Sequence, residues 1–241
     1  MRIPRIYTPQ ALHENSLIEL DDAAANHVAK VLRMKTGRAL FLFNGETQSH
    51  FEANVVSVDR RLVSIQLGHQ IPTQLESPLH IHLGQAISKG DRFEFAIQKA
   101  VELGVNEITP LWTEHCDVKL NSERLEKKMR QWQQIAIAAC EQSGRDIVPI
   151  IHPAMQLNLW LSQVEADEKW VLDPRGTTQK SADVVTRACI LVGPEGGLSD
   201  SEVTLACENS FKAKLIGPRI LRTETAALTA LCLMQDLWGD F

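Results

Sequence analysis

From residue 78 onward the sequence alternates short apolar runs with longer amphipathic segments, and this alternation constrains the fold most. The runs "LHIHLGQAI", "EITPLW", "KWVLD" and "ACILVG" are typical of strands in the core of a sheet. The segment "DRFEFAIQKAVELG" is typical of a helix. "SERLEKKMRQWQQIAIAACEQSG" predicts a longer helix with Ser122 as its N-cap and Gly144 at its end. Strands that alternate with helices predict a mainly parallel sheet covered by helices.

The first seventy residues have a different pattern, which is rich in short strands. "RALFLFNGET" is an apolar run that closes with Asn44 and Gly45, a pair typical of tight hairpin turns. "FEANVVSVDRRLVSIQLG" predicts two more strands. Between them and the N-terminus, "DDAAANHVAKVLRMKTG" predicts a short helix that is capped by Asp21 or Asp22 and ends near Gly37. Several short strands with one helix predict a small barrel.

The proline-containing segment "HQIPTQLESPLH" separates these two patterns, and we interpret it as a linker. We therefore expect two domains, residues 1–72 and residues 73–241. The net charge of −5 predicts no general attraction to polyanions, so any nucleic-acid binding would have to use a local patch of cations.

The sequence also narrows the cellular compartment and the class of protein. No apolar run is long enough to cross a bilayer, and "MRIPRIYTPQ" lacks the apolar core of a secretory signal. The five cysteines are scattered and form no C-x-x-C pair, which argues against a disulfide framework and against a zinc site. We therefore expect a cytoplasmic protein.

The predicted strand ends carry the residues of chemical interest, because ligands of open parallel sheets bind beyond the carboxyl ends of the strands. The stretch "LVGPEGGLSD" has neither the lysine of a P-loop nor the G-x-G-x-x-G spacing. Glu195 would repel a phosphate, and Ser199 and Glu202 form a capping box that occupies the helix donors. A carboxylate suits ribose hydroxyls or a positively charged ligand. The alternative is a tight turn before a helix with a solvated glutamate.

The second stretch of interest is "LIGPRILRTETAALTAL". Thr223 is a natural N-cap for the last helix, so Arg222 lies where the helix dipole disfavours a cation. We therefore expect Arg222 to have an anionic partner, which is either Glu224, Glu195 or a substrate phosphate. The helix that follows is apolar on nearly all sides, which predicts burial in the core or at a subunit interface.

Taken together, these two stretches resemble the knotted SPOUT methyltransferases, and more closely the bacterial 16S ribosomal RNA uridine N3-methyltransferase family. "MRIPRIY", "NHVAKVLRMKTG", "ESPLHIHLGQAISKGDRFEFAIQKAVELGV", "ITPLW" and "KKMRQWQQIAIAACEQSGR" also match the family's pattern, so the resemblance covers nearly the whole chain. Only "LDPRGTTQKSADVVT" matches weakly.

This resemblance implies an α/β fold class, with a SPOUT-type parallel sheet and a trefoil knot in the C-terminal domain and a small PUA-like RNA-binding β-barrel at the N-terminus. It also implies S-adenosylmethionine as the methyl donor and a homodimer as the assembly. The implied substrate is 16S ribosomal RNA of the small ribosomal subunit, methylated at N3 of one uridine in the decoding region.

The same resemblance implies which residues line the cofactor, largely through backbone groups. They are Leu172, Gly193, Pro194, Glu195, Gly196, Ile216, Gly217, Leu221 and Thr223. Because uracil N3 carries a proton that must leave, the reaction needs a proton acceptor or a group that stabilises the uracil anion. We expect Arg222 to orient and stabilise the uracil or a flanking phosphate, and Glu224 or Glu195 to accept the proton. Positioning alone would supply much of the acceleration.

Seven cations are candidates for RNA contacts, with ordinary solvated surface charge as the alternative for each. They are Arg2, Arg5, Arg33, Lys35, Lys89, Arg92 and Arg145. We expect no metal site, because His80 and His82 alternate on one strand without other ligands beside them in the sequence.

Two other classes of function stay open from the sequence. One is a non-catalytic RNA-binding or ribosome-assembly protein that retains the fold. The other is a nucleotide-dependent enzyme that binds phosphate in the glycine-rich turn. Within the methyltransferase class, another RNA or a ribose 2′-O target is conceivable.

Overall fold

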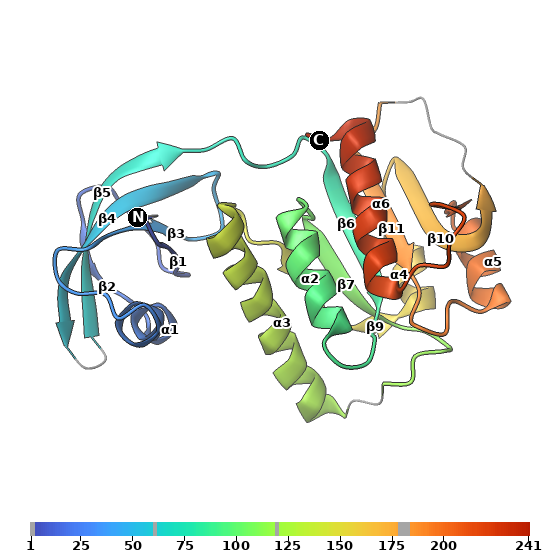
Figure 1. Cartoon of the computed structure of the whole chain (residues 1–241), viewed down its shortest axis with the longest axis horizontal. Helices are drawn as coiled ribbons and strands as arrows, with labels where there is room; N and C mark the ends of the chain where they lie inside the picture. Colours follow the sequence, from blue (N-terminus) through green and yellow to red (C-terminus); the bar gives the residue numbers. More distant parts are fainter. Residues whose placement is uncertain (1–2, 60–61, 119–120, 178–183) are drawn as a thin grey trace. The chain divides into compact units, whose positions relative to one another are not determined.

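The computed structural model describes residues 3–59, 62–118, 121–177 and 184–241, and the chain divides into two compact units (Figure 1). The first unit contains Met1–Glu76 together with Ile137–Val148. The second contains Ser77–Ala136 and Pro149–Phe241. The first unit is therefore built from two segments that lie far apart in the sequence.

The first unit has a five-stranded mixed sheet with strand order β1-β3-β4-β5-β2, in which only the β1–β3 pair is parallel. Its elements are β1 (Arg5–Tyr7), β2 (Leu17–Glu19), α1 (Asp22–Asn26), a π-helical turn (His27–Val31), β3 (Ala39–Phe43), β4 (Ser49–Asp59) and β5 (Leu62–Pro72). Apolar side chains alternate with exposed ones along β4 and β5, because one sheet face packs on the core of the unit while the other faces solvent.

Two turns of this unit refine the expectations from sequence. The Asp21 side chain accepts hydrogen bonds from Ala23 N and Ala24 N, which confirms it as the cap of the first helix. The Asn44–Gly45 step is not a two-residue hairpin, since five residues connect β3 and β4. Gly45 instead has a φ of +81° and forms a bridge with Ile147. A contact with a segment a hundred residues away thus replaces the local turn.

The segment Ile137–Val148 joins the first unit through buried ion pairs. Arg5 pairs with Asp146, whose carboxylate also accepts a 2.6 Å hydrogen bond from Thr73 Oγ1. Arg145 Nε donates to both carboxylate oxygens of Glu76 at 3.1 Å. These four charged side chains are each less than one tenth exposed, so each pair neutralises charges that would be costly to bury alone.

The second unit has a parallel sheet of strand order β12-β10-β11-β6-β7-β8, with β9 pairing with β7. The strands are β6 (His80–Ala86), β7 (Glu107–Trp112), β8 (Ile150–Ile151), β9 (Met155–Gln156), β10 (Glu168–Thr177), β11 (Arg187–Val192) and β12 (Lys212–Lys214). The prediction of a mainly parallel sheet is confirmed. The strand predicted at "KWVLD" continues through "PRGT" as β10, whose register to β12 shifts between Leu172 and Thr177.

Helices cover both faces of this sheet. They are α2 (Arg92–Glu102), α3 (Ser122–Ser143), which continues into the first unit, α4 (Leu157–Gln163), α5 (Asp200–Glu208) and α6 (Thr223–Trp238). The Trp170 ring lies 5.7 Å from that of Trp238 on α6. Its neighbour Val171 packs with Trp160 of α4 and Ala206 of α5. Because successive side chains of a strand point to opposite faces, α6 lies on one face and α4 and α5 on the other.

The ends of the helices correct two predicted caps. Asn121, not Ser122, caps α3, because its side chain accepts a 2.9 Å hydrogen bond from Arg124 N. Gly144, with a φ of +100°, ends this helix as predicted. Thr223 is the first residue of α6, and Arg222 occupies the N-cap position. Among the described residues, no helix is both long and apolar enough to span a membrane.

Candidate active site

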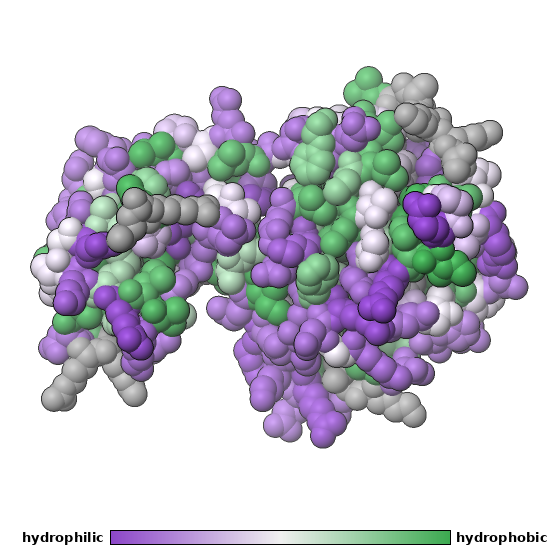
Figure 2. Space-filling model, viewed as in Figure 1, coloured by the Kyte–Doolittle hydropathy of each residue, from purple (hydrophilic) through white to green (hydrophobic). Residues whose placement is uncertain are grey.

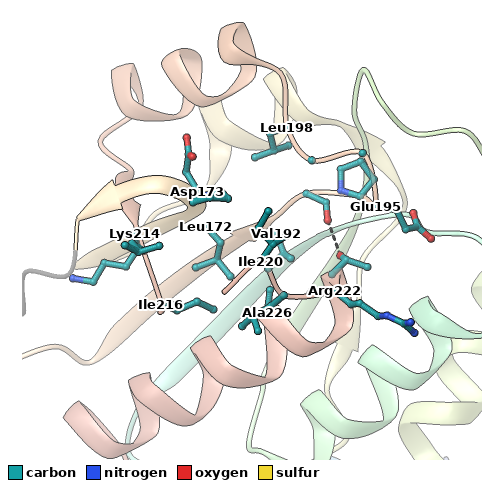
Figure 3. A pocket seen from close by; sticks show the side chains of 18 of the residues that line it. Leu172, Asp173, Val192, Glu195, Leu198, Lys214, Ile216, Ile220, Arg222 and Ala226 are labelled. Atoms are coloured by element: carbon teal, nitrogen blue, oxygen red, sulfur yellow. Dashed lines mark hydrogen bonds between the residues drawn. The ribbon is translucent and has the colours of Figure 1, made fainter. Parts of the chain in front are cut away.

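The carboxyl ends of β10, β11 and β12 enclose a cavity of about 640 Å³ (Figure 3). Three chain segments form most of its wall, namely residues 172–175, 192–198 and 214–223. All nine residues expected to contact the cofactor line it. The position of the cavity follows from the parallel sheet, since loops that leave neighbouring parallel strands meet at one edge.

The glycine-rich turn after β11 is held in shape by bonds of its own and of the helix behind it. Gly197 N donates to Pro194 O at 2.9 Å, and Gly197 has a φ of +72°. Ser199 and Glu202 form the predicted capping box at the start of α5. A Cβ on Gly193 would lie 3.0 Å from the backbone nitrogen of Leu198. The turn is therefore closed, and its donors at the helix end are occupied, so it is no phosphate cradle.

Glu195 lies at the rim of the cavity with its side chain about one third exposed. Its Oε1 accepts a 2.9 Å bond from Arg92 Nη1 and a 3.1 Å bond from Lys89 N. Arg92 also lines the cavity. Within the protein, Glu195 therefore forms its ion pair with Arg92, at the start of α2, and not with Arg222.

Arg222 is exposed and forms no ion pair with any residue that the structure describes. In Figure 3 its side chain extends away from the apolar residues of the cavity. The backbone at Arg222 is extended, with a φ of −65° and a ψ of 155°, and the next residue begins α6. The expectation that Glu195 or Glu224 neutralises Arg222 is wrong, which leaves an external anion as its expected partner.

Glu224 does not belong to the cavity wall, although the sequence suggested it as a proton acceptor. Its Oε2 is buried and has no hydrogen-bond partner within the described ranges. Of the first turn of α6, Thr223 and Ala226 line the cavity and Glu224 does not. The geometry thus favours Glu195 over Glu224 for contact with a ligand.

The floor of the cavity is apolar, and one end of it is charged. Leu172, Val192, Ile216, Ile220 and Ala226 supply aliphatic surface (Figure 3). Such surface accommodates a flat aromatic ring.

At the charged end, burial raises the pKa of Asp173, but hydrogen bonds from Arg175 outweigh it and hold that pKa below its usual value. Burial lowers the pKa of Lys214, whose Nζ lies 4.7 Å from the centre of the Trp170 ring. The cavity therefore joins an apolar slot to a polar rim.

Known proteins that are similar to this chain show its family. Residues 75–235 match the family described as RNA methyltransferase domain, and residues 20–67 match the RNA methyltransferase PUA domain. The chain is 38% identical to ribosomal RNA small subunit methyltransferase E of Buchnera aphidicola from Acyrthosiphon pisum, over 100% of this chain and 96% of the relative. The chain belongs to this methyltransferase family.

Solved structures of the family agree with the fold described above. Ribosomal RNA small subunit methyltransferase E of Neisseria gonorrhoeae, crystallised with S-adenosylmethionine, has a TM-score of 0.92 and 37% identity, with full coverage of both chains. A methyltransferase structure from Legionella pneumophila, in complex with the same cofactor, has a TM-score of 0.96 and 42% identity, again with full coverage. The SPOUT-type parallel sheet and the PUA-like N-terminal unit are thereby confirmed.

In this member of the methyltransferase family, a second cavity of about 510 Å³ adjoins the glycine-rich turn. It shares Arg92, Glu195 and Gly196 with the first cavity. Lys89 lines it and pairs with Asp117 at 2.6 Å, with both side chains exposed. Two of the predicted RNA-contacting cations, Lys89 and Arg92, are thus brought to the edge of the candidate active site.

The other predicted RNA contacts divide into two groups. Arg33 and Lys35 are exposed in the first unit, as an RNA contact requires. Arg5 and Arg145 are buried in the ion pairs with Asp146 and Glu76, which fits an internal structural role and corrects the expectation of RNA contact. The remaining candidate, Arg2, lies outside the described residues.

At the opposite edge of the sheet, the two histidines of β6 do have neighbours. His82, Glu107 and His152 have ligand-type atoms within 4.8 Å of one another, a grouping that could hold a metal ion. His152 Nε2 and Glu107 Oε2 are 2.6 Å apart, and His80 Nε2 is 3.1 Å from Glu107 Oε1. The sequence missed this grouping because its members come from three separate segments, β6, β7 and the residue after β8. The bond between His152 and Glu107 and that between His82 and Thr109 account for it as a polar network.

Sequence reasoning also missed two residues behind the glycine-rich turn. His115 Nδ1 lies 3.1 Å from Gly197 O, and a Cβ on Gly196 would lie 3.1 Å from His115 Cβ. Gln85, at the end of β6, is 1% exposed and bonds to Thr223. No local motif marks either residue, and only the strand order β11-β6-β7 would have indicated them.

Proposed function

We propose that this protein uses S-adenosylmethionine to methylate N3 of a uridine in the decoding region of 16S ribosomal RNA. The observation that carries the proposal is the cavity at the carboxyl edge of the sheet, in a chain of this family, with an apolar floor and a glycine-rich turn unsuited to phosphate. The relatives from Neisseria gonorrhoeae and Legionella pneumophila, crystallised with this cofactor, support the choice of methyl donor.

The residues of the cavity fit this cofactor. Leu172, Ile216 and Ala226 offer aliphatic surface to an adenine ring. Gly193 and Gly196 allow a ligand to approach the backbone where a side chain would crowd Leu198 or His115. Asp173 and Glu195 bring carboxylates to the wall, which suits ribose hydroxyls and a positively charged sulfur. When bound, S-adenosylmethionine supplies an electrophilic methyl group.

On the side of the acceptor, this chain's own residues must orient uracil and help its N3 proton to leave. We assign the orienting role to Arg222, because it lies at the cavity and no described carboxylate neutralises it. A fixed cation there stabilises the negative charge that develops on the uracil oxygens. Glu195 is the better candidate for the proton acceptor, since both of its internal bonds fall on Oε1 and it lines both cavities.

We further propose an RNA-binding domain, residues 1–72, and a methyltransferase domain, residues 73–241, with the trefoil knot that the family resemblance implies. The segment Ile137–Val148 is the exception to this division, because it packs in the first compact unit. Lys89 and Arg92 at the cavity, together with Arg33 and Lys35, supply the local cations that an acidic protein needs to bind ribosomal RNA.

A homodimer through the C-terminal domain completes the proposal. Figure 2 shows hydrophobic residues gathered over α6, where Leu233 is 38% exposed, and Phe95 of the neighbouring α2 is 46% exposed. Apolar side chains that remain exposed on packed helices fit a second copy of the chain. Light scattering coupled to size-exclusion chromatography measures the mass that decides this point.

The test of the function is transfer of a labelled methyl group from S-adenosylmethionine to undermethylated 30S subunits and to naked 16S RNA, followed by mapping of the modified base. We expect one N3-methyluridine in the decoding region. A ribose-methylated product or another RNA target would overturn the specificity. Absence of cofactor binding by calorimetry would instead favour a non-catalytic RNA-binding protein, and binding of ATP or NAD would favour a nucleotide-dependent enzyme.

A further inference from the structure

A short chain of buried hydrogen bonds connects three segments around the methyl-donor cavity. Gln85 Nε2 donates to Thr223 Oγ1 at 2.9 Å, and Thr223 Oγ1 donates to the carbonyl oxygen of Gly193 at 2.6 Å. Gln85 is 1% exposed and Thr223 is 6% exposed. The chain thus runs from the end of β6 through the first residue of α6 to the glycine-rich turn, and Gly193 and Thr223 both line the cavity.

The direction of each bond is fixed by chemistry. The carbonyl of Gly193 can only accept, so the single hydroxyl proton of Thr223 is committed to it. Thr223 Oγ1 must then accept its other bond, and only the amide nitrogen of Gln85 can donate it. The same amide group gives its second proton to Ala86 O at 3.2 Å. A carboxylate at position 85 could not make this pattern.

The burial of Gln85 has a cost that core packing does not explain. Its Oε1 is buried without a hydrogen-bond partner among the described residues. An amide oxygen buried in this way reduces stability, and an apolar side chain of similar size would avoid the loss. What the amide provides, and an apolar side chain would not, is the hydrogen bond that it donates to Thr223.

We propose that Gln85 is a positioning residue of the methyl-donor site, which sets the place of the Gly193 carbonyl through the hydroxyl of Thr223. This inference rests on the proposed function. Lys89 N and Arg92 hold the same glycine-rich turn at Glu195, so the segment that begins with Gln85 holds both ends of the Gly193–Glu195 stretch. Thr223 directly follows Arg222, and the relay therefore also fixes the backbone beside the candidate uracil-orienting cation.

The experiment measures the dissociation constant of S-adenosylmethionine by calorimetry, the thermal midpoint, and kcat and KM on 30S subunits. The variants are Gln85→Met, Thr223→Val, their combination, and Thr223→Ser. Each of the first two breaks the hydrogen-bonded chain from Gln85 to Gly193, and for the loss of its neutral bonds we expect about five- to tenfold weaker cofactor binding. The double variant should bind no more than about twofold worse than either single one, because both break one chain. Thr223→Ser keeps the hydroxyl and should bind as the wild type does.

Two further variants separate positioning from general destabilisation. Gln85→Glu keeps the size of the side chain but draws the Thr223 proton away from Gly193, so it should weaken cofactor binding as Gln85→Met does. Thr109→Val removes a hydroxyl that is 1% exposed on the adjacent strand β7 and that bonds to His82. This control should lower the thermal midpoint and leave cofactor binding unchanged.

Unchanged cofactor binding in Thr223→Val, or strictly additive losses in the double variant, would overturn the inference while leaving the proposed function in place. Failure of the wild type to bind S-adenosylmethionine would overturn both. If Gln85→Met does not fold, the comparison of Thr223→Val with Thr223→Ser still decides between the outcomes, because Thr223→Ser keeps the hydroxyl that Thr223→Val replaces with a methyl group.

Discussion

The two edges of the parallel sheet in the second unit differ in whether their charged side chains have partners within the protein. At the amino edge, His80, His152 and Arg187 all lie within 4.0 Å of one carboxylate, that of Glu107. At the carboxyl edge, Arg222 lines the cavity without an ion pair to any described residue. Charges that satisfy one another stabilise a fold, whereas a cation that is left unpaired beside a cavity is available to a ligand.

The two edges also differ in the size of the residues that form them. At the carboxyl edge, a Cβ on Gly193 would crowd Leu198 at 3.0 Å, and one on Gly196 would crowd His115 at 3.1 Å. At the amino edge, the strands begin with large polar residues that bond across the sheet. One edge is therefore shaped to admit a ligand against its backbone, and the other is closed by its own side chains.

The largest effect that we expect is on turnover when the unpaired cation is removed. Arg222→Ala should lower kcat by about 10²- to 10³-fold, because a fixed charge beside the uracil is lost. Its dissociation constant for S-adenosylmethionine should stay within about twofold of the wild type, since Arg222 extends away from the apolar floor. Arg219→Ala, a neighbouring exposed cation of the same cavity, is the matched control. Equal losses of turnover and cofactor affinity would refute the role of Arg222.

The next effect concerns the closed backbone of the turn. A Cβ at Gly193 would meet the backbone nitrogen of Leu198 at 3.0 Å, so Gly193→Ala must displace one wall of the cavity. We expect cofactor binding at least about tenfold weaker, measured by calorimetry. Gly68→Ala serves as the control, since its Cβ would make only an ordinary 3.4 Å contact in the first unit. Normal binding by Gly193→Ala would mean that the cofactor does not use this turn.

At the amino edge we expect a dependence of stability on pH and no change in catalysis. Burial lowers the pKa of His82 to about 4, against a weaker opposing effect of Glu107. The unfolded chain, with an ordinary imidazole, therefore binds more protons between pH 6.5 and about 4, and stability falls as pH falls through that window. His82→Gln should flatten the fall, by at most about 1.4 kcal/mol per pH unit. Urea unfolding at pH 7, 6 and 5 measures it, and an unchanged slope would contradict the assignment.

The smallest effect is expected for a cation that is already paired at the surface. Lys89→Ala removes an exposed pair with Asp117 and should leave the thermal midpoint unchanged, because such pairs contribute little. If Lys89 contacts RNA phosphate, its loss should weaken RNA binding a few-fold and reduce the slope of log affinity against log salt by about one. An unchanged slope in a filter-binding assay would place Lys89 outside the RNA contact.

The sequence predicted those parts of the fold and site that depend on local pattern. The strand at "EITPLW", the capping box of Ser199 and Glu202 and the end of α3 at Gly144 are as expected, because each rests on neighbours in the chain. The nine residues predicted to line the cofactor came from the family resemblance, and all of them line one cavity.

What the sequence could not predict depends on residues that meet across the fold. The Asn44–Gly45 turn is altered by Ile147, Arg145 is buried by Glu76, and Arg92 takes the carboxylate that Arg222 was expected to use. In each case a distant segment supplies the partner that decides the outcome. Local propensity carries no information about such partners until the strand order is known.

The discontinuous first unit has a consequence for how the chain is made. Its buried Arg5 and Glu76 form ion pairs with Asp146 and Arg145, which come much later in the chain. When residues 1–76 have been synthesised, the residues that pair with Arg5 and Glu76 still lie some seventy residues further along the chain. The N-terminal unit cannot form these buried ion pairs during translation until all of α3 and the residues after it have emerged, so a fragment cut at the linker should be less stable than the same residues in the full chain.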